Sequence, residues 1–245
     1  MSGWLDGRVL ENRQWTDSLF SLRVAAPRLQ FVAGQFVRIA LDVEGERIAR
    51  PFSFVNAPDD PVLEFYGVIV PEGPLSPRLA RLKAGDAIQV ADNPAGWLIV
   101  SEVPPAEDLW LVATGTGIAP FMSILRTGAP WQRYRRVILV HAARRASELV
   151  YGDAIRELQS RREQLRYVSF VSREAHPRSL AGRVPEAIRD GRLETLAGPI
   201  SPERSQFMLC GNPQMLRDVA AELVARGLKK HRRRSPGQIT VESFW

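Results

Sequence analysis

Four apolar runs, each followed by a helical pattern, constrain the fold of the second part of this chain more than any other feature. The runs are LWLVAT, RVILVHAA, LRYVSFVS and SQFMLC, at residues 109–114, 136–143, 165–172 and 205–210. They are apolar almost throughout, which is typical of strands covered on both faces. Helical patterns follow them at residues 117–128, 147–163, 184–193 and 212–227. This alternation predicts an α/β doubly wound parallel sheet, to which QITVESFW at 238–245 would add a last strand.

The first hundred residues show a different pattern, in which short β-rich runs are separated by turn residues. The runs lie at residues 4–15, 19–26, 35–42, 47–55, 62–70 and 87–91. Such spacing is typical of an antiparallel barrel or sandwich. A short helix is predicted at 76–82, with Ser76 as its N-cap and Pro77 at its first position. The proline-rich SEVPPAED at 101–108 marks a boundary, so we expect one domain over 1–100 and a second over 105–245.

Composition excludes several classes of protein. The 245 residues suffice for two cores, and 45% apolar with 24% charged residues is ordinary for a soluble globular protein. No apolar run is long enough to predict a membrane span, and the N-terminus lacks the pattern of a secretory signal. The single cysteine, Cys210, cannot form an internal disulfide, an iron–sulfur cluster or a thiolate zinc site. We therefore expect a cytoplasmic protein without a metal site.

The positive charge is modest and its main cluster is ambiguous. The net charge is +6, and KKHRRR at 229–234 is the densest basic run. This run either faces the negative end of a preceding helix or binds an acidic partner. Charge alone does not separate nucleic acid from an acidic protein.

Two glycine-containing turns follow predicted strands. In ATGTGIAP, residues 113–120, Gly115 and Gly117 would let the backbone approach a phosphate at a helix amino end. A plain strand–helix turn is the alternative, because Pro120 stands where the dinucleotide motif has a third glycine. LCGNPQM, residues 209–215, repeats the arrangement and places Cys210 at the carboxyl edge of the sheet, although a buried structural cysteine is the alternative. Together the two turns favour a nucleotide crevice.

Three arginines recur after consecutive elements of the predicted sheet. Arg144 follows the run at 136–143, Arg173 follows the run at 165–172, and Arg183 lies ten residues further on. Each alone could be a surface charge. Because a guanidinium matches a phosphate bidentately, the three together predict an additional phosphate, the 2′-phosphate of NADP.

The run RPFSF, residues 50–54, has unusual contents for a strand. An arginine, two aromatic rings and a hydroxyl stand within five residues. It is either an edge strand with a charged end or a surface for a flat, anionic ligand.

Several motifs together resemble the ferredoxin–NADP reductases, most closely the bacterial two-domain type. They are RPFS at 50–53, FYGVIVPEGPLS at 65–76, ATGTGIAPF at 113–121, HAAR at 141–144, VSRE at 171–174, LCGNPQM at 209–215 and the terminal VESFW. The resemblance covers nearly the whole chain in the family's order. It implies an N-terminal antiparallel β-barrel that binds FAD and a C-terminal α/β domain that binds NADP, with the last residues returning to the flavin.

The resemblance also implies site residues for FAD. Arg50 would pair with the pyrophosphate, Phe52 would stack on the flavin ring, and Ser53 would lie near its N5 atom. The full set is Arg50, Pro51, Phe52, Ser53, Tyr66, Gly67, Val68, Ile69, Pro74, Leu75, Ser76, Thr116, Phe244 and Trp245. The family usually has tyrosine where Phe52 stands, and Phe244 also lacks a hydroxyl, so a hydrogen bond near the flavin is lost at each position.

For NADP and for catalysis the resemblance implies a second set. The NADP residues would be Ala143, Arg144, Ser172, Arg173, Arg183, Gly211, Asn212 and Pro213. The catalytic residues would be Ser53, Cys210, Glu242 and Phe244. Cys210 and Glu242 would lie beside the nicotinamide, Phe244 would cover the flavin where the nicotinamide docks, and Trp245 would extend onto the FAD adenine.

The implied activity is an FAD-dependent oxidoreductase that moves electrons between NADPH and the acidic one-electron carriers ferredoxin and flavodoxin. We expect a monomer without nucleic-acid or membrane partners, with Arg232, Arg233 and Arg234 as candidates for a carrier-docking surface. The main alternative is an NADH-dependent flavin reductase component of an oxygenase on the same scaffold. A basic nucleic-acid-binding protein and a non-catalytic nucleotide-binding subunit are further alternatives.

Overall fold

The computed structural model describes residues 3–243, and the contacts within the chain divide it into two compact units. Unit 1 holds the chain up to Ile99 together with Ala119–Thr127. Unit 2 holds Val100–Ile118 together with the chain from Gly128 onward. The sequence therefore enters unit 2, returns to unit 1 for one helix, and enters unit 2 again.

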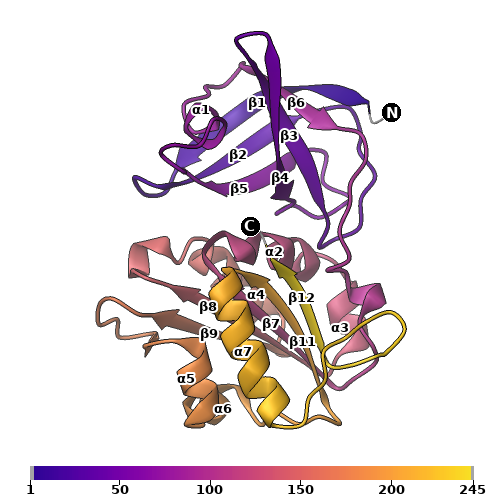
Figure 1. The fold of residues 1–245 in the computed structure, drawn as a ribbon, viewed down its shortest axis with the longest axis vertical. Coiled ribbons are helices and arrows are strands. Elements are labelled where there is room, and N and C mark those ends of the chain that lie inside the picture. The colour runs from indigo at the N-terminus through magenta and orange to yellow at the C-terminus, as the bar shows by residue number, and fades with distance from the viewer. Residues whose placement is uncertain (1–2, 244–245) are drawn as a thin grey trace. The chain divides into compact units, whose positions relative to one another are not determined.

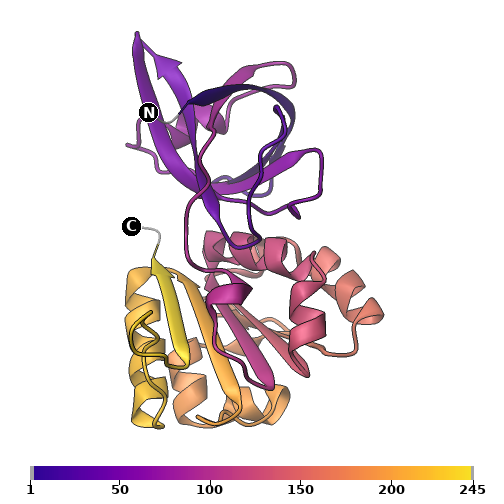
Figure 2. The same ribbon diagram turned by 90° about the vertical axis from the view of Figure 1, so that its right-hand side faces the viewer.

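Unit 1 is an antiparallel barrel, as predicted. Its strands are β1 (Trp4–Gln14), β2 (Leu19–Ala25), β3 (Phe36–Val43), β4 (Glu46–Ser53), β5 (Leu63–Val68) and β6 (Ala87–Ala91), in the order β4-β3-β6-β1-β2-β5. A bridge between Phe54 and Phe65 joins the two ends of this order and closes the curled sheet that Figure 2 shows. Buried side chains from alternate positions, such as Val37 and Ile39 in β3, fill the barrel.

The predicted short helix of unit 1 differs from the expectation. Helix α1 (Ser76–Leu79) is only four residues long, and its N-cap is Leu75. Ser76 lies inside the helix because its Oγ accepts the N–H of Val70 at 2.9 Å instead of capping the helix. The prediction of Ser76 as the N-cap was therefore wrong.

Helix α2 (Ile118–Leu125) packs in unit 1 although it follows a strand of unit 2. Ser123 Oγ donates to the carbonyl of Asn56 at 2.7 Å. Arg126 donates to the carbonyl of Val55 at 3.0 Å and to the carboxylate of Glu64 at 2.8 Å. Hydrogen bonds and an ion pair thus attach this helix to the barrel.

Unit 2 is a parallel sheet with helices, which confirms the predicted α/β doubly wound fold (Figure 1). Its strands are β7 (Asp108–Thr114), β8 (Arg136–Ala143), β9 (Leu165–Val171), β10 (Leu180–Ala181), β11 (Ser205–Gly211) and β12 (Ile239–Ser243), in the order β10-β9-β8-β7-β11-β12. From β7 the chain builds the sheet outward through β8 and β9, and then returns to the other side of β7 with β11. The order therefore reverses between β7 and β11.

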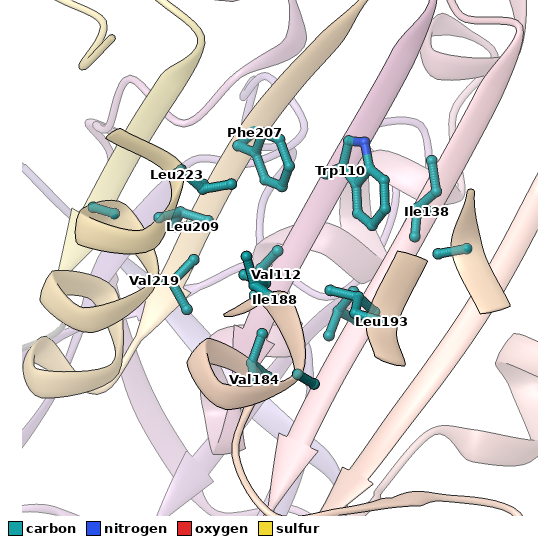
Figure 3. Close-up of a cluster of buried hydrophobic side chains, with 14 of the residues drawn as sticks. Trp110, Val112, Ile138, Val184, Ile188, Leu193, Phe207, Leu209, Val219 and Leu223 are labelled. Carbon is teal, nitrogen blue, oxygen red and sulfur yellow. The ribbon is translucent and has the colours of Figure 1, made fainter. Parts of the chain in front are cut away.

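Helices α5 (Val184–Arg189), α6 (Arg192–Ala197) and α7 (Pro213–Ala225) pack on one face of this sheet. Figure 3 shows their apolar side chains against those of β7, β8 and β11. Trp110 and Phe207, which are register partners on β7 and β11, stack with ring centroids 5.2 Å apart. Asp108 to Ala113 are all buried, so both faces of β7 are covered.

The helices of unit 2 differ from the predicted ones in two boundaries and one additional helix. The helix predicted from residue 147 begins only as α4 (Gly152–Arg161), because Tyr151 has φ of 68° and the segment before it is a 3₁₀ turn at Ala146–Glu148. Asp190 and Gly191 divide the helix predicted at 184–193 into α5 and α6. The short α3 (Ala129–Arg133) was not predicted. Within the described residues, no helix is long and apolar enough to span a membrane.

The basic run at 229–234 is part of a hairpin that precedes β12, drawn as a yellow loop in Figure 1. Lys230 bridges Ile239, and Arg232 and Ser235 exchange backbone hydrogen bonds at 3.0 and 2.9 Å. We call residues 229–238 the basic hairpin. Since β12 begins at Ile239, the basic hairpin lies at the amino edge of the parallel sheet. It also lies beyond the last turn of α7, which ends at Ala225, so the dipole of that helix does not account for it.

Candidate functional site

The reversal of strand order between β7 and β11 predicts a ligand site at their carboxyl ends. The first glycine turn, the 3₁₀ turn Gly115–Gly117, follows β7 at this point. A Cβ atom on Gly117 would lie 2.4 Å from the carbonyl oxygen of Cys210 at the end of β11, which is closer than any side chain can come. Glycine at this position therefore lets the two turns lie against each other.

The second glycine turn is joined to the first by a hydrogen bond. Gly211 has φ of 127°, and a Cβ there would lie 2.4 Å from Thr114 Oγ1. That same oxygen accepts the backbone N–H of Asn212 at 2.9 Å. Thr114, which ends β7, thus holds the turn that leads into α7.

The amino end of α7 is already occupied by the protein's own groups. Asn212 is the N-cap, and its Oδ1 accepts the N–H groups of Gln214 and Met215 at 2.9 and 3.3 Å. Pro213 has no N–H, and that of Asn212 is bound by Thr114. An anion at this helix end would have to displace the cap, so the contacts of Gly211, Asn212 and Pro213 with NADP remain a prediction.

Cys210 and Glu242 lie side by side, as the prediction of a shared site requires. They are register partners on the parallel strands β11 and β12. Cys210 is fully buried, and burial, followed by the negative charge of Glu242, raises the pKa of its thiol well above the usual range. The thiol is therefore uncharged at neutral pH and can pack against a ligand or donate a weak hydrogen bond, but it is no nucleophile. Phe244 and Trp245 lie outside the described residues.

A residue of this site that sequence reasoning missed is His141 on β8. Its side chain is fully buried, and its Nε2 lies 3.2 Å from the carbonyl oxygen of Gly115. Burial lowers the pKa of His141 to about 4, so the ring is neutral and its Nε2–H donates to Gly115. The isolated histidine in HAAR, without metal-ligand spacing, gave no signal for a contact with a turn 26 residues away.

The three predicted arginines gather at the carboxyl edge of the sheet. Arg173 N–H donates to the carbonyl of Arg144 at 2.9 Å, so the loops after β8 and β9 lie together. Gly182 N–H donates to Val171 at 3.2 Å, which brings Arg183 beside the end of β9. We call Arg144, Arg173 and Arg183 the arginine cluster. Among the described residues, no carboxylate oxygen lies within 4.0 Å of any of their guanidinium groups. Uncompensated cations at one edge form a site for an anion.

In unit 1 the predicted FAD residues also lie together. The bridge between Phe54 and Phe65 places residues 50–53 antiparallel to residues 66–69. Phe52 lies against the backbone of Gly67, where a Cβ would be 2.9 Å from the ring. Pro51 stands on β4, an end strand of the sheet order, where its missing N–H costs no ladder bond.

The polar groups along this strip fit a flat, anionic ligand. Ser53 is 4% exposed, and its hydroxyl has no hydrogen-bond partner in the part of the chain that the structure describes. A buried hydroxyl of this kind is costly unless a ligand supplies its partner. Arg50 donates to the carbonyl of Ala49 at 2.8 Å and has no described carboxylate within 4.0 Å. An aromatic face, an orphaned hydroxyl and an uncompensated cation therefore agree with the flavin and pyrophosphate of FAD.

The remaining predicted FAD residues divide into side-chain and backbone candidates. Tyr66 is buried. The side chain of Leu75 is buried as well, so Leu75 can contact a ligand only through its backbone. Ser76 accepts from Val70, which leaves its own hydroxyl hydrogen to donate outward. Ile69 N–H donates to Ser18 at 2.7 Å. The partly buried Thr116 lies in the first glycine turn of unit 2.

Both units match models of known protein families. The model of the oxidoreductase FAD-binding domain matches residues 10–97, and that of the oxidoreductase NAD-binding domain matches residues 111–221. The flavodoxin/ferredoxin–NADP reductase of Escherichia coli (strain K12) is 50% identical over 248 residues, covering 100% of both chains. The ferredoxin–NADP reductase of Pseudomonas aeruginosa is 38% identical over 254 residues, covering 99% of this chain and 98% of that one.

A solved structure is similar over the same length. The ferredoxin NADP⁺ reductase of Neisseria gonorrhoeae, with bound FAD and NADP, superposes with a TM-score of 0.94 at 33% identity. The match covers 99% of each chain.

Proposed function

The chain belongs to the flavodoxin/ferredoxin–NADP reductase family, and from this premise we infer which of its residues carry the activity. The protein is an FAD-dependent oxidoreductase that moves electrons between NADPH and the one-electron carriers ferredoxin and flavodoxin. The full-length identity of 50% to flavodoxin/ferredoxin–NADP reductases carries this conclusion. The division of labour among the residues is our proposal.

We propose that unit 1 is the FAD domain and unit 2 the NADP domain, which follow the predicted 1–100 and 105–245 except that Ala119–Thr127 belongs to unit 1. Bound FAD would supply the exchange between the two-electron hydride chemistry of NADPH and the one-electron chemistry of the carrier. Arg50 would neutralise the pyrophosphate, Phe52 would support the flavin ring, and Ser53 would supply the hydrogen bond that its buried hydroxyl lacks. The other proposed FAD residues are Pro51, Tyr66, Gly67, Val68, Ile69, Pro74, Leu75, Ser76, Thr116, Phe244 and Trp245.

For unit 2 we propose that the arginine cluster binds the 2′-phosphate, with Ala143 and Ser172 lining the same loops. Among the described residues, no carboxylate oxygen lies within 4.0 Å of the guanidinium groups of Arg144, Arg173 and Arg183. This supports the assignment, because a guanidinium without an acid partner gains most from a phosphate. The oxygenase reductase alternative uses NADH, which has no 2′-phosphate, and would leave the cluster without a ligand.

Around the nicotinamide we propose Cys210 and Glu242, whose adjacency on β11 and β12 supports a shared role. The neutral thiol would pack against the ring and exclude water, while Glu242 would act as a hydrogen-bond acceptor. Phe244, outside the described residues, would cover the flavin until the nicotinamide replaces it.

The partners of the protein are electron carriers. We further propose that it is a cytoplasmic monomer without nucleic-acid partners. The single, buried Cys210 agrees with a reducing compartment. Light scattering during size exclusion tests the monomer, and titration with duplex DNA at low salt tests the absence of nucleic-acid binding.

The first experiment is an anaerobic titration of the FAD-loaded protein with NADPH, with NADH added to a parallel sample. The visible spectrum is recorded after each addition. We expect a yellow protein that NADPH bleaches at far lower concentration than NADH. Equal bleaching by both nucleotides would contradict the role of the arginine cluster, and a protein that takes up no FAD would contradict the assignment of residues 50–53.

A further inference from the structure

The loop after β8 carries three consecutive backbone N–H groups that donate to carboxylates. Arg144 and Arg145 donate to the same Oε2 of Glu148, at 2.8 and 3.3 Å. Ala146 donates to Oε1 of Glu174 at 2.7 Å. Consecutive N–H groups of this kind form a natural anion site, and here the protein fills it with its own side chains. A phosphate at this loop would therefore bind to the arginine side chains and not to these N–H groups.

The two carboxylates differ in where they come from. Glu148 belongs to the same loop and lies three residues after Arg145, the spacing of a helix capping box. Glu174 belongs to the loop after β9 and directly follows Arg173 of the arginine cluster. Its bond to Ala146 therefore joins two loops that each carry one arginine of the cluster.

This bond extends the pairing of the two loops beyond the sheet. Ser172 N–H donates to Ala143 at 3.2 Å and Arg173 N–H to Arg144 at 2.9 Å, as a continuation of the strands. The side chain of Glu174 then reaches past Arg144 and Arg145 to Ala146. With these three links, the backbones that carry Arg144 and Arg173 are held at a fixed separation.

The charge of Glu174 is balanced locally. Its Oε2 lies 3.7 Å from a guanidinium nitrogen of Arg145. Arg145 thereby offsets a carboxylate that would otherwise repel a phosphate, while the guanidinium groups of Arg144 and Arg173 have no carboxylate within 4.0 Å in the part of the chain that the structure describes. Of the two neighbouring arginines in this loop, Arg145 thus pairs with Glu174, and Arg144 keeps its guanidinium for a phosphate.

We propose that Glu174 is a positioning residue for nucleotide specificity, which fixes the spacing of Arg144 and Arg173 so that both reach one 2′-phosphate. This inference rests on the proposed function of the arginine cluster. Glu174 itself does not touch the nucleotide. Its contribution is preorganisation, since guanidinium groups already in place lose less freedom when they bind.

Two variants remove the same hydrogen bond from opposite sides. Glu174→Ala deletes the acceptor. Ala146→Pro deletes the donor and keeps the carboxylate, and the backbone tolerates proline there because Arg145 is extended, at φ −126° and ψ 155°, and Ala146 begins a 3₁₀ turn. Glu174→Gln keeps an acceptor oxygen without the charge. Glu157→Ala, which removes an exposed ion pair with Arg161 on α4, is the matched control.

The measurement is the affinity of each FAD-loaded variant for 2′-phospho-AMP and for AMP by calorimetry, together with KM and kcat for NADPH and NADH. We expect Glu174→Ala and Ala146→Pro to weaken 2′-phospho-AMP binding and raise KM for NADPH by about five- to tenfold. AMP affinity, KM for NADH and kcat should stay within about twofold of wild type. Glu174→Gln and Glu157→Ala should resemble wild type.

The outcomes separate this inference from the proposed function. If wild type itself binds 2′-phospho-AMP no better than AMP, the function of the arginine cluster fails, and this inference with it. If wild type discriminates and both Glu174→Ala and Ala146→Pro discriminate equally well, the inference alone is overturned. It is also overturned if Glu174→Gln is as impaired as Glu174→Ala, because the charge and not the hydrogen bond would then be decisive.

Discussion

The two ends of strand β8 carry arginines in opposite surroundings. Arg136 begins the strand and donates from Nε and Nη2 to the two carboxylate oxygens of Asp108, at 2.7 and 2.5 Å. Asp108 is completely buried. Arg144 follows the last residue of the same strand, and no described carboxylate lies within 4.0 Å of its guanidinium group. One strand thus presents a paired cation at its amino end and an unpaired one at its carboxyl end.

The same difference holds along the two edges of the sheet. At the amino edge, Glu107 lies 3.0 Å from Arg204 and 4.0 Å from Arg135. At the carboxyl edge, Glu148 and Glu174 accept backbone N–H groups, and no described carboxylate lies within 4.0 Å of the guanidinium groups of the arginine cluster. Their surroundings therefore distinguish the arginines that pair with Asp108 and Glu107 from those of the arginine cluster.

The largest expected effect is at the amino end of β8. Arg136→Met leaves the buried carboxylate of Asp108 without its partner, so the free energy of unfolding should fall by about 3–5 kcal/mol. Urea denaturation measures this fall. Arg135→Met, which removes only an exposed pair at 4.0 Å, is the control and should cost less than about 0.5 kcal/mol. Equal stability of the two variants would show that the ion pair of Arg136 with Asp108 does not stabilise the fold.

The middle of β8 supplies a pH-dependent test. The pKa of His141 is lowered from 6.5 to about 4 by burial, so below pH 6.5 the unfolded chain binds a proton that the folded chain does not take up until about pH 4. Stability should therefore be independent of His141 above pH 6.5 and fall by about 3 kcal/mol between pH 6.5 and 4.

The variant His141→Gln isolates this effect, because glutamine keeps a donor for Gly115 and does not titrate. Urea denaturation of both proteins from pH 7.5 down to 4, about one unit apart, should show a smaller acid loss in the variant. Parallel loss in both proteins would show that other groups cause the acid dependence.

At the carboxyl end the expected effect falls on nucleotide binding and not on folding. Arg173→Met should raise KM for NADPH roughly 10–100-fold, as the loss of charge-assisted hydrogen bonds to a phosphate does, equivalent to about 1.4–2.8 kcal/mol. KM for NADH should change little, and the free energy of unfolding should stay within about 0.5 kcal/mol. If Arg173→Met lowered the free energy of unfolding as much as Arg136→Met, the arginines at the carboxyl edge would be structural like Arg136.

The smallest effect is expected in the basic hairpin. Arg232 and Arg234 have no described carboxylate within 4.0 Å, yet they lie at the amino edge of the sheet, away from the arginine cluster. The double change Arg232→Ser with Arg234→Ser should alter KM for NADPH and for the carrier less than about twofold at physiological salt. A marked, salt-dependent rise in KM for the carrier would instead make the basic hairpin a docking surface.

Sequence patterns predicted the elements of the fold whose cause is local. Continuous apolar strands, Pro213 at the start of α7 and the alternation of strand and helix all persist in the structure. The errors arose where a contact or a backbone angle that the local pattern does not indicate decides the structure. The N–H of Val70 donates to the hydroxyl of Ser76, which therefore does not cap the helix. The chain turns at Tyr151, where φ is 68°, so the predicted helix does not extend to the residues before Gly152.

The candidate site shows the same limit. Its arginines, glycines and cysteine were predicted because they lie at or after the carboxyl ends of strands, and parallel strands end at one edge. His141 and Glu174 were missed because their partners, Gly115 and Ala146, are 26 and 28 residues away. Glu148 was missed as well, because Arg145 stands where the capping-box pattern has Ser or Thr.

The double passage of the chain between the units restricts how this protein can be recombined with its relatives. Unit 1 needs Ala119–Thr127, whose Ser123 and Arg126 bind the loop at residues 55–56. A gene crossover near residue 100 would give the barrel of one parent and helix α2 of the other. Functional chimaeras therefore depend on matching α2 to the barrel, and the natural unit of exchange on this side of the molecule is discontinuous in the gene.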